Sequence, residues 1–192
     1  MTLDEQQAIL DEYASHTKNR VLVQPRPYAL QLFPPEGARI LDVGAYLGAN
    51  LLYYANLGFE IVGVEAARTY CDRFAEELKK YPTLKKRAKM ICGMVETVKI
   101  PGRFQAVLAG EVLCYTPDPQ RMMTRIAALC DPGGVLLATM PKEAQQEFPS
   151  HFTLVELEAL VRSHKFRPVF TNYLPGWGNS LVSAVRAIRE ED

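Results

Sequence analysis

Ile40-Leu-Asp-Val-Gly-Ala-Tyr-Leu-Gly-Ala-Asn50 is the stretch that decides how this chain folds. The apolar run from Ala38 to Val43 predicts a buried strand, and Gly44 permits a sharp exit from it. A helix is expected to begin within or just after residues 45–48, because apolar residues follow at helical spacing: Leu47, Leu51, Leu52 and Ala55. A strand that runs through a glycine-containing turn into a helix is typical of the first unit of a nucleotide-binding α/β sheet.

The turn after this strand does not suit a pyrophosphate. A dinucleotide site needs G-x-G-x-x-G, but Tyr46 and Ala49 occupy the positions of the second and third glycines. The sequence also contains no G-x-x-x-x-G-K-[ST] phosphate loop. Asp42, at the end of the strand, would repel a pyrophosphate but attract a ligand with an ammonium and a sulfonium group. S-adenosylmethionine (SAM) carries both groups, so the charge argument favours SAM.

Three motifs carry a resemblance to a known family. Asp42-x-Gly44-x-x-x-Gly48 resembles the first motif of class I SAM-dependent methyltransferases, usually written D-x-G-x-G-x-G, with Tyr46 in place of the middle glycine. The stretch from Gly110 to Pro119, G-E-V-L-C-Y-T-P-D-P, resembles the small-x-E-V-L-x-H-x-P-D-P signature of small-molecule methyltransferases, with Tyr115 in place of histidine. The phrase L-C-D-P-G-G-V-L-L-A, residues 129–138, is similar to the turn that follows in that family. The resemblance covers about residues 35–188.

The alternation of strands and helices predicts parallel strands with right-handed crossovers and helices on both faces. Further strands are expected at residues 59–64, 88–92, 104–109 and 135–140, followed by an antiparallel pair at 167–174 and 180–188. The resemblance implies an α/β fold with a Rossmann-like, mostly parallel sheet of seven strands in the order 3-2-1-4-5-7-6, the last strand antiparallel. We expect a single domain over residues 1–192, with N-terminal lid helices in residues 1–35 and the core in residues 36–192.

The composition narrows the class of protein. Hydrophobic residues make up 48% and charged residues 23% of the 192 residues, as is ordinary for a globular protein. Lys plus Arg equals Asp plus Glu at 22 each, so no overall charge favours nucleic acid or an anionic membrane. No apolar run reaches the length of a membrane span, and no signal peptide is recognisable. The cysteines lack a C-x-x-C pair and are expected as reduced thiols of a cytoplasmic protein without a metal site: Cys71, Cys92, Cys114 and Cys130.

Cofactor-binding residues are expected at the carboxyl ends of the first, second and fourth strands. Glu65 ends the second strand 23 residues after Asp42, a spacing at which an acid reaches a ribose diol and accepts two hydrogen bonds. The competing interpretations are a solvated acid at Glu65 and simple core packing at Met94. The resemblance, together with the expected lid, places these further residues at the cofactor: Arg26, Gly44, Gly48, Ala66, Met94, Val95 and Gly110.

Methyl transfer is an in-line displacement at the sulfonium carbon, so holding the acceptor in line could supply about 7–11 kcal/mol. A base is needed only for an acceptor that binds protonated, and the candidates are Glu111, Tyr115 and His151. Tyrosine is a poor base at neutral pH, so Tyr115 is expected as a wall or a hydrogen-bond donor. His151 could equally be a residue at the entry to a helix. The residues expected around the acceptor have aromatic or polar-tipped side chains: Tyr13, Tyr115, His151, Tyr173 and Trp177. For Tyr173 and Trp177, covering the sheet edge is the alternative.

The expected function is SAM-dependent methyl transfer to an O, N or C atom of a small molecule, by a monomer or a homodimer. A short chain without a large insertion favours a small acceptor over a protein or RNA. One alternative is a catalytically silent, methyltransferase-like partner protein, because Tyr46 and Tyr115 depart from the family. A ring of Tyr46 in the methionine site would favour this alternative, whereas a negative φ and a ring directed away would keep the turn competent. The second alternative to a methyltransferase is an NAD(P)-dependent oxidoreductase. That class would need glycines at positions 46 and 49, where this chain has Tyr46 and Ala49.

Overall fold

The structure, a computed structural model, describes residues 25–143, 148–176 and 180–191. Tyr13 and Trp177, two residues expected at the acceptor, lie outside the described residues. The same holds for residues 1–24 of the expected lid. The described part of that lid contains a 3-10 helix, η1 (Pro27–Gln31), in which proline occupies the first turn.

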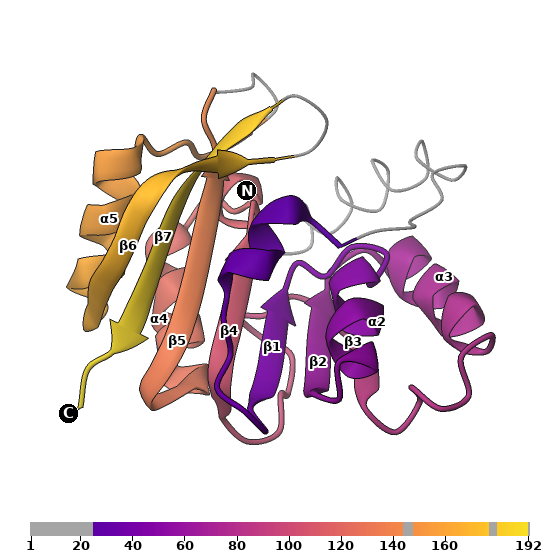
Figure 1. Cartoon of the computed structure of the whole chain (residues 1–192). Helices are drawn as coiled ribbons and strands as arrows, with labels where there is room; N and C mark the ends of the chain where they lie inside the picture. The colour runs from indigo at the N-terminus through magenta and orange to yellow at the C-terminus, as the bar shows by residue number, and fades with distance from the viewer. Residues whose placement is uncertain (1–24, 144–147, 177–179, 192) are drawn as a thin grey trace.

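The chain forms one seven-stranded sheet in the order β3-β2-β1-β4-β5-β7-β6, which confirms the predicted order (Figure 1). Strands β1 to β5 pair in parallel, and β7 pairs antiparallel with both β5 and β6. The strands are β1 (Arg39–Val43), β2 (Glu60–Glu65), β3 (Ala88–Cys92), β4 (Phe104–Gly110), β5 (Cys130–Pro141), β6 (Phe166–Pro175) and β7 (Leu181–Arg189).

Helices cover both faces of the sheet and divide the core into two clusters (Figure 1). On one face Leu51 and Phe74 pack with η1, and on the other Met123 and Leu157 pack with β4 and β5. The helices are α2 (Ala49–Asn56), α3 (Arg68–Leu78), α4 (Pro119–Leu129) and α5 (Leu154–Ser163), with a short 3-10 helix η2 (Leu113–Tyr115). Within the described part of the chain, no helix is long and apolar enough to cross a membrane.

Local signals in the sequence set the helix ends. Pro119 opens α4, and the Asp118 side chain accepts a hydrogen bond from the third helical N–H. A capping box opens α5, in which Thr153 and Glu156 exchange hydrogen bonds. The fifth strand was predicted from residue 135 but begins at Cys130, because the pairing with β4 resumes across a register shift.

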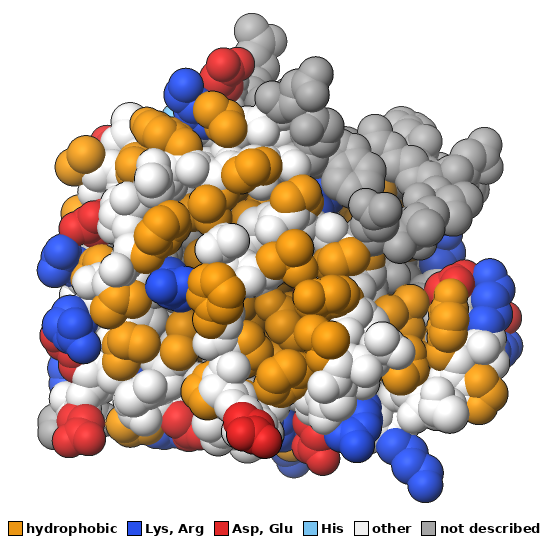
Figure 2. Space-filling view, in the orientation of Figure 1, with side chains coloured by type: hydrophobic (Ala, Val, Ile, Leu, Met, Phe, Trp, Pro, Cys, Tyr) orange, Lys and Arg blue, Asp and Glu red, His pale blue; other side chains and the backbone are white. Residues whose placement is uncertain are grey.

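Hydrophobic side chains gather in the middle of the face that Figure 2 shows, whereas Lys, Arg, Asp and Glu lie mainly around its edge. Among the large hydrophobic residues, Phe33 is 60% exposed, and the Arg186 guanidinium lies 4.8 Å from its ring centroid. The middle of this face carries few charged groups. Buried acids gather instead at the carboxyl edge of the sheet.

Candidate functional site

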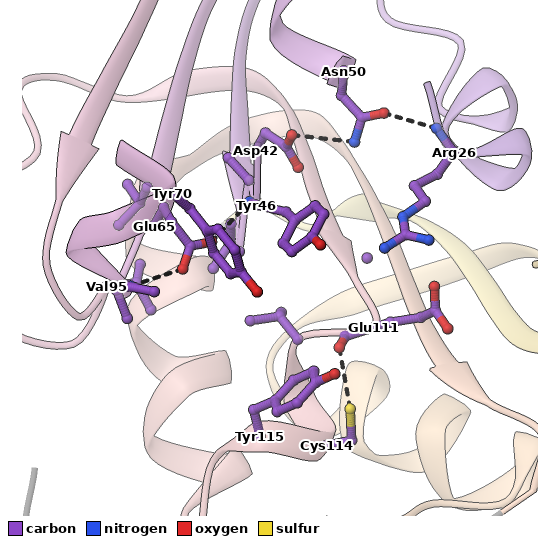
Figure 3. Close-up of a pocket in the computed structure, with 18 of the residues that line it drawn as sticks. Arg26, Asp42, Tyr46, Asn50, Glu65, Tyr70, Val95, Glu111, Cys114 and Tyr115 are labelled. Atoms are coloured by element: carbon purple, nitrogen blue, oxygen red, sulfur yellow. Dashed lines mark hydrogen bonds between the residues drawn. The ribbon is translucent and has the colours of Figure 1, made fainter. Parts of the chain in front are cut away.

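A cavity of ≈ 390 Å³ opens at the carboxyl ends of β1, β2 and β4. This volume lies within the range of small-molecule sites, about 300–1,000 Å³. The walls come from the turn after β1, the end of β2, the turn after β3 and the segment that follows β4 (Figure 3). The cavity therefore lies at the edge of the sheet where the sequence predicted a ligand.

The turn after β1 is held against β2 by backbone hydrogen bonds. The N–H groups of Gly44 and Ala45 donate to the Val64 carbonyl at 2.9 and 3.1 Å. Gly44 has φ +74 and borders the cavity. Gly48 was expected at the ligand, but it is not among the residues that line the cavity. It caps α2 with φ +79, and its missing side chain leaves room for the Phe74 ring.

Tyr46 has φ +53, so the negative φ considered for it is wrong. Its N–H donates to Glu65 Oε2 at 2.7 Å, and the turn requires the left-handed conformation that a glycine usually supplies. The ring lines the cavity and packs edge-on against Tyr70, with 4.3 Å between centroids. Its hydroxyl is buried and has no hydrogen-bond partner among the described residues. Tyr46 thus presents an unsatisfied polar group at the cavity.

Glu65 lies at the end of β2 and is 8% exposed. One carboxylate oxygen accepts from the Tyr46 N–H at 2.7 Å, and the other accepts from the Ala67 N–H at 2.8 Å. Each oxygen has a further lone pair, so the carboxylate can accept additional hydrogen bonds from a ligand. Ala66, which follows Glu65, also lines the cavity.

Asp42 is 2% exposed and is bonded to a residue that sequence reasoning missed. Asn50 Nδ2 donates to Asp42 Oδ2 at 3.2 Å, and Asn50 Oδ1 accepts from the Arg26 N–H at 3.1 Å (Figure 3). Burial raises the pKa of Asp42 from 3.8 to about 7, the Asn50 hydrogen bond lowers it, and the nearby Glu65 raises it. The only signal for Asn50 in the sequence is a polar residue in the first turn of an apolar helix.

Glu111 follows β4 and has φ +52, an uncommon conformation for a residue other than glycine. Its N–H donates to the hydroxyl and the carbonyl of Thr139 on β5, at 3.0 and 3.1 Å, which fixes the backbone. Burial raises the pKa of Glu111, while Arg26 and a hydrogen bond from Tyr28 lower it. Tyr28 was also missed. It packs so closely on Gly110 that an added Cβ there would lie 2.6 Å from the ring.

The turn after β3 supplies the wall beside Glu65. Met94 and Val95 are buried and line the cavity, where the resemblance placed them. Glu96, which was not predicted, lines it as well, and its Oε2 atom is buried without a hydrogen-bond partner within the described ranges. Burial raises the pKa of Glu96. This wall therefore combines apolar side chains with an acceptor, Glu96 Oε2, that is unsatisfied among the described residues.

Of the residues expected around an acceptor, the structure brings only Tyr115 to the cavity within the described part of the chain. Its ring packs against Phe148, with 4.9 Å between centroids. His151 does not line the cavity, because its Nε2 atom lies 3.1 Å from the Pro141 carbonyl oxygen. Tyr173 is 43% exposed on β6, where the Lys142 ammonium lies 5.2 Å from its ring centroid.

The charges of the cavity are strongly unequal. Four carboxylates line it (Asp42, Glu65, Glu96 and Glu111), and Arg26 is the one basic residue in the described lining. Such a site favours a ligand that carries positive charge and several hydrogen-bond donors. Aromatic and apolar side chains near Tyr115 add a wall suited to a second, less polar group.

We expect the free energy of unfolding to fall as the pH rises from about 4 to about 7, because the folded protein holds a proton on Asp42 that the unfolded chain releases. The raised pKas of Glu96 and Glu111 act in the same direction. Urea denaturation of wild type and Asp42→Asn across this window isolates the contribution of Asp42. The variant should show the shallower slope, and equal slopes would contradict the assignment.

Residues 13–171 match a family described as a methyltransferase domain. An uncharacterized methyltransferase of Schizosaccharomyces pombe is 28% identical over 156 residues, which cover 72% of this chain and 54% of that protein. The ubiquinone biosynthesis O-methyltransferase of Nitrobacter winogradskyi is 29% identical over 104 residues, covering 54% and 38%. The chain thus spans about half the length, or less, of these curated relatives.

Among solved structures, the fold is similar to that of magnesium protoporphyrin IX methyltransferase from Synechocystis PCC 6803 with bound SAM. The TM-score is 0.67 at 14% identity, over 96% of this chain and 79% of the other. At this identity the likeness concerns the fold alone.

Proposed function

The chain belongs to the methyltransferase domain family, and we propose that it transfers a methyl group from SAM to a small-molecule acceptor. The observation that carries the proposal is the acid-lined cavity at the carboxyl ends of β1, β2 and β4. The sulfonium and the ammonium of SAM suit a cavity in which carboxylates outnumber cationic groups. The diol, the aromatic base and the amino-acid end of SAM would each have to find partners in the same cavity.

Each part of SAM has a candidate partner on this chain. Glu65 would accept hydrogen bonds from the ribose hydroxyls, and Met94 and Val95 would flank the adenine. Glu96 Oε2, which is unsatisfied among the described residues, would accept from the adenine amino group. At the methionine end, Asp42 would face the ammonium and Arg26 the carboxylate. Gly44, Ala66 and Gly110 also line the cavity, so their backbone atoms would border the cofactor.

The acceptor would enter beside Tyr115 and Phe148, because their rings form the apolar end of the cavity. Methyl transfer requires the acceptor atom, the methyl carbon and the sulfur to lie in line, and such positioning can supply about 7–11 kcal/mol. If the acceptor must lose a proton, Glu111 is the candidate base, since burial raises its pKa. Tyr115 would serve as a wall or a hydrogen-bond donor. His151, which contacts Pro141 outside the lining, has no proposed role.

Calorimetric titration of SAM and of its product, S-adenosylhomocysteine, into the purified chain tests the proposal. We expect one molecule of either ligand to bind per chain. NAD serves as the matched control and should not bind, because Tyr46 and Ala49 replace two glycines that a pyrophosphate needs. Failure of both SAM and its product to bind would reject the enzyme and leave the silent partner protein.

One observation favours that second candidate: the Tyr46 ring reaches the cavity with a buried, unpartnered hydroxyl. A ring in this place could occupy part of the space that the methionine end needs. Against it, the cavity retains ≈ 390 Å³ with the ring in place.

Tyr46→Gly separates the two candidates. Removing the ring loses an aromatic contact worth about 0.5–1.5 kcal/mol, while glycine relieves a left-handed strain of about 1–2 kcal/mol. We therefore expect stability within about 2 kcal/mol of wild type and SAM affinity within about threefold. Tyr46→Phe is the control that keeps the ring but removes the hydroxyl. Binding of SAM by Tyr46→Gly alone would mean that the ring blocks the site in the wild type.

A further inference from the structure

We infer that the methyl acceptor is a small amine, held through its ammonium by Glu111, with its apolar body against the rings of Tyr115 and Phe148. This inference rests on the proposed function and deepens it by naming a substrate class. It follows from pairing each charged residue of the cavity with a group of bound SAM and asking which carboxylate then has no group of SAM assigned to it.

Glu111 is the carboxylate for which SAM offers no partner. Three acids have groups of SAM assigned to them: Asp42 the ammonium, Glu65 the ribose and Glu96 the adenine. Arg26 lies near Glu111 in Figure 3 and is assigned to the methionine carboxylate, so its charge is then shared with the cofactor. Glu111 then shares the Arg26 charge with the cofactor and keeps the Tyr28 hydrogen bond, so a cationic acceptor is the group that would complete the balance of its buried charge.

The position of Glu111 is fixed on several sides. Its N–H is held by Thr139 on β5, and its carbonyl accepts from Cys114 Sγ at 3.1 Å on η2. The Tyr28 hydroxyl, from η1, bonds to the carboxylate, and Arg26 faces it from the start of the same segment. The backbone keeps φ +52 within this frame, as is typical of residues whose strained conformation serves a site. The carboxylate is thus preorganised to receive a hydrogen-bond donor.

The aromatic part of the same cavity lining also suits an amine. Tyr115 and Phe148 pack edge to face, so their ring faces and edges border the same end of the cavity. Aromatic faces attract ammonium groups and bind the apolar body of an amine. An acceptor that carries a carboxylate or a phosphate would instead meet four acids in the described lining, and its entry would be opposed by repulsion.

Methyl transfer from SAM to an amine balances with Glu111 as the only proton acceptor. The bound ammonium gives one proton to the Glu111 carboxylate, which frees the nitrogen lone pair. That lone pair forms the new N–C bond with the methyl carbon while the electrons of the C–S bond remain on sulfur, and the sulfonium becomes a thioether. The methylated nitrogen then carries the positive charge, and the proton on Glu111 passes to solvent.

The test uses the chain saturated with S-adenosylhomocysteine and three probes of one shape: tyramine, 4-hydroxyphenylethanol and 4-hydroxyphenylacetate. They share a phenol ring and differ at the end group, which is an ammonium, a hydroxyl or a carboxylate. We expect tyramine to bind about tenfold or more tightly than the carboxylate, as a charge-assisted contact with Glu111 requires. Glu111→Gln should reduce this preference to within about threefold.

Glu60→Gln removes a carboxylate at the exposed amino end of β2, outside the described cavity lining, and is the matched control. It should leave the preference for tyramine within about threefold of wild type. Equal affinities for the three probes, a preference for the carboxylate, or no tyramine binding would overturn the inference. Because product binding is measured first, loss of the proposed function would be seen separately, as a failure to bind S-adenosylhomocysteine.

Discussion

Glu65→Ala is expected to weaken SAM binding by roughly ten- to a hundredfold, because removing a hydrogen-bond partner of this kind costs about 1.5–3 kcal/mol. The loss has two sources. In the proposed binding mode the ribose would lose its acceptor, and the N–H groups of Tyr46 and Ala67, which Glu65 bonds at 2.7 and 2.8 Å, would no longer be held. Both changes affect the cofactor end of the cavity, and the measurement is calorimetric titration of SAM.

Glu60→Ala is the control for this variant, since Glu60 lies exposed at the amino end of the same strand. It should leave SAM affinity within about threefold of wild type. Glu65→Gln should be intermediate, because the amide keeps one acceptor but cannot accept from both N–H groups. Unchanged affinity in Glu65→Ala would place the ribose elsewhere in the cavity.

Most of the fold could be predicted because each signal is local. The apolar run of β1, Pro119 at the start of α4 and Thr153 at the start of α5 each fix an element from a few neighbouring residues. The order of the strands came from the motif resemblance, and the sheet confirms it. The boundary that differed most, the start of β5, depends on long-range pairing with β4, which no local pattern reveals.

The site was harder to predict because several of its residues contact each other only in the folded chain and lie far apart in the sequence. Tyr28 reaches Glu111 from a segment more than 80 positions earlier in the chain, and Asn50 bridges Asp42 to Arg26. A sequence pattern gives the residue types but not these contacts. His151 is the reverse case. The sequence left open a site residue or a residue at a helix entry, and the ring bonds to the Pro141 carbonyl outside the described cavity lining.

Tyr46 shows how a tertiary contact can override a local preference. A tyrosine ordinarily avoids positive φ. Here the backbone hydrogen bonds fix the turn whatever the side chain, because the Tyr46 N–H donates to Glu65 and the N–H groups of Gly44 and Ala45 donate to Val64. The same turn carries Gly48, where a side chain would meet a buried ring. The two positions therefore share a backbone conformation but differ in the space around it.

Gly48→Ala is expected to lower the free energy of unfolding by about 2–5 kcal/mol, which sums a left-handed strain of about 1–2 with an overpacking cost of about 1–3. The added Cβ would overlap the ring of Phe74, which is buried on α3. Because natural domains have only about 5–15 kcal/mol of stability, this single methyl group would remove a large part of it. Urea denaturation followed by circular dichroism measures the loss.

Gly37→Ala separates the two causes. Gly37 has φ +72, close to the +79 of Gly48, but a Cβ added there meets nothing within 4 Å. It should therefore show the strain alone, about 1–2 kcal/mol. Phe74→Leu offers the complementary control, since a smaller side chain at this position should reduce the additional cost of Gly48→Ala in a double-mutant cycle. If Gly48→Ala destabilises the protein no more than Gly37→Ala, the Phe74 ring moves aside freely, and the glycine is needed only for its backbone conformation.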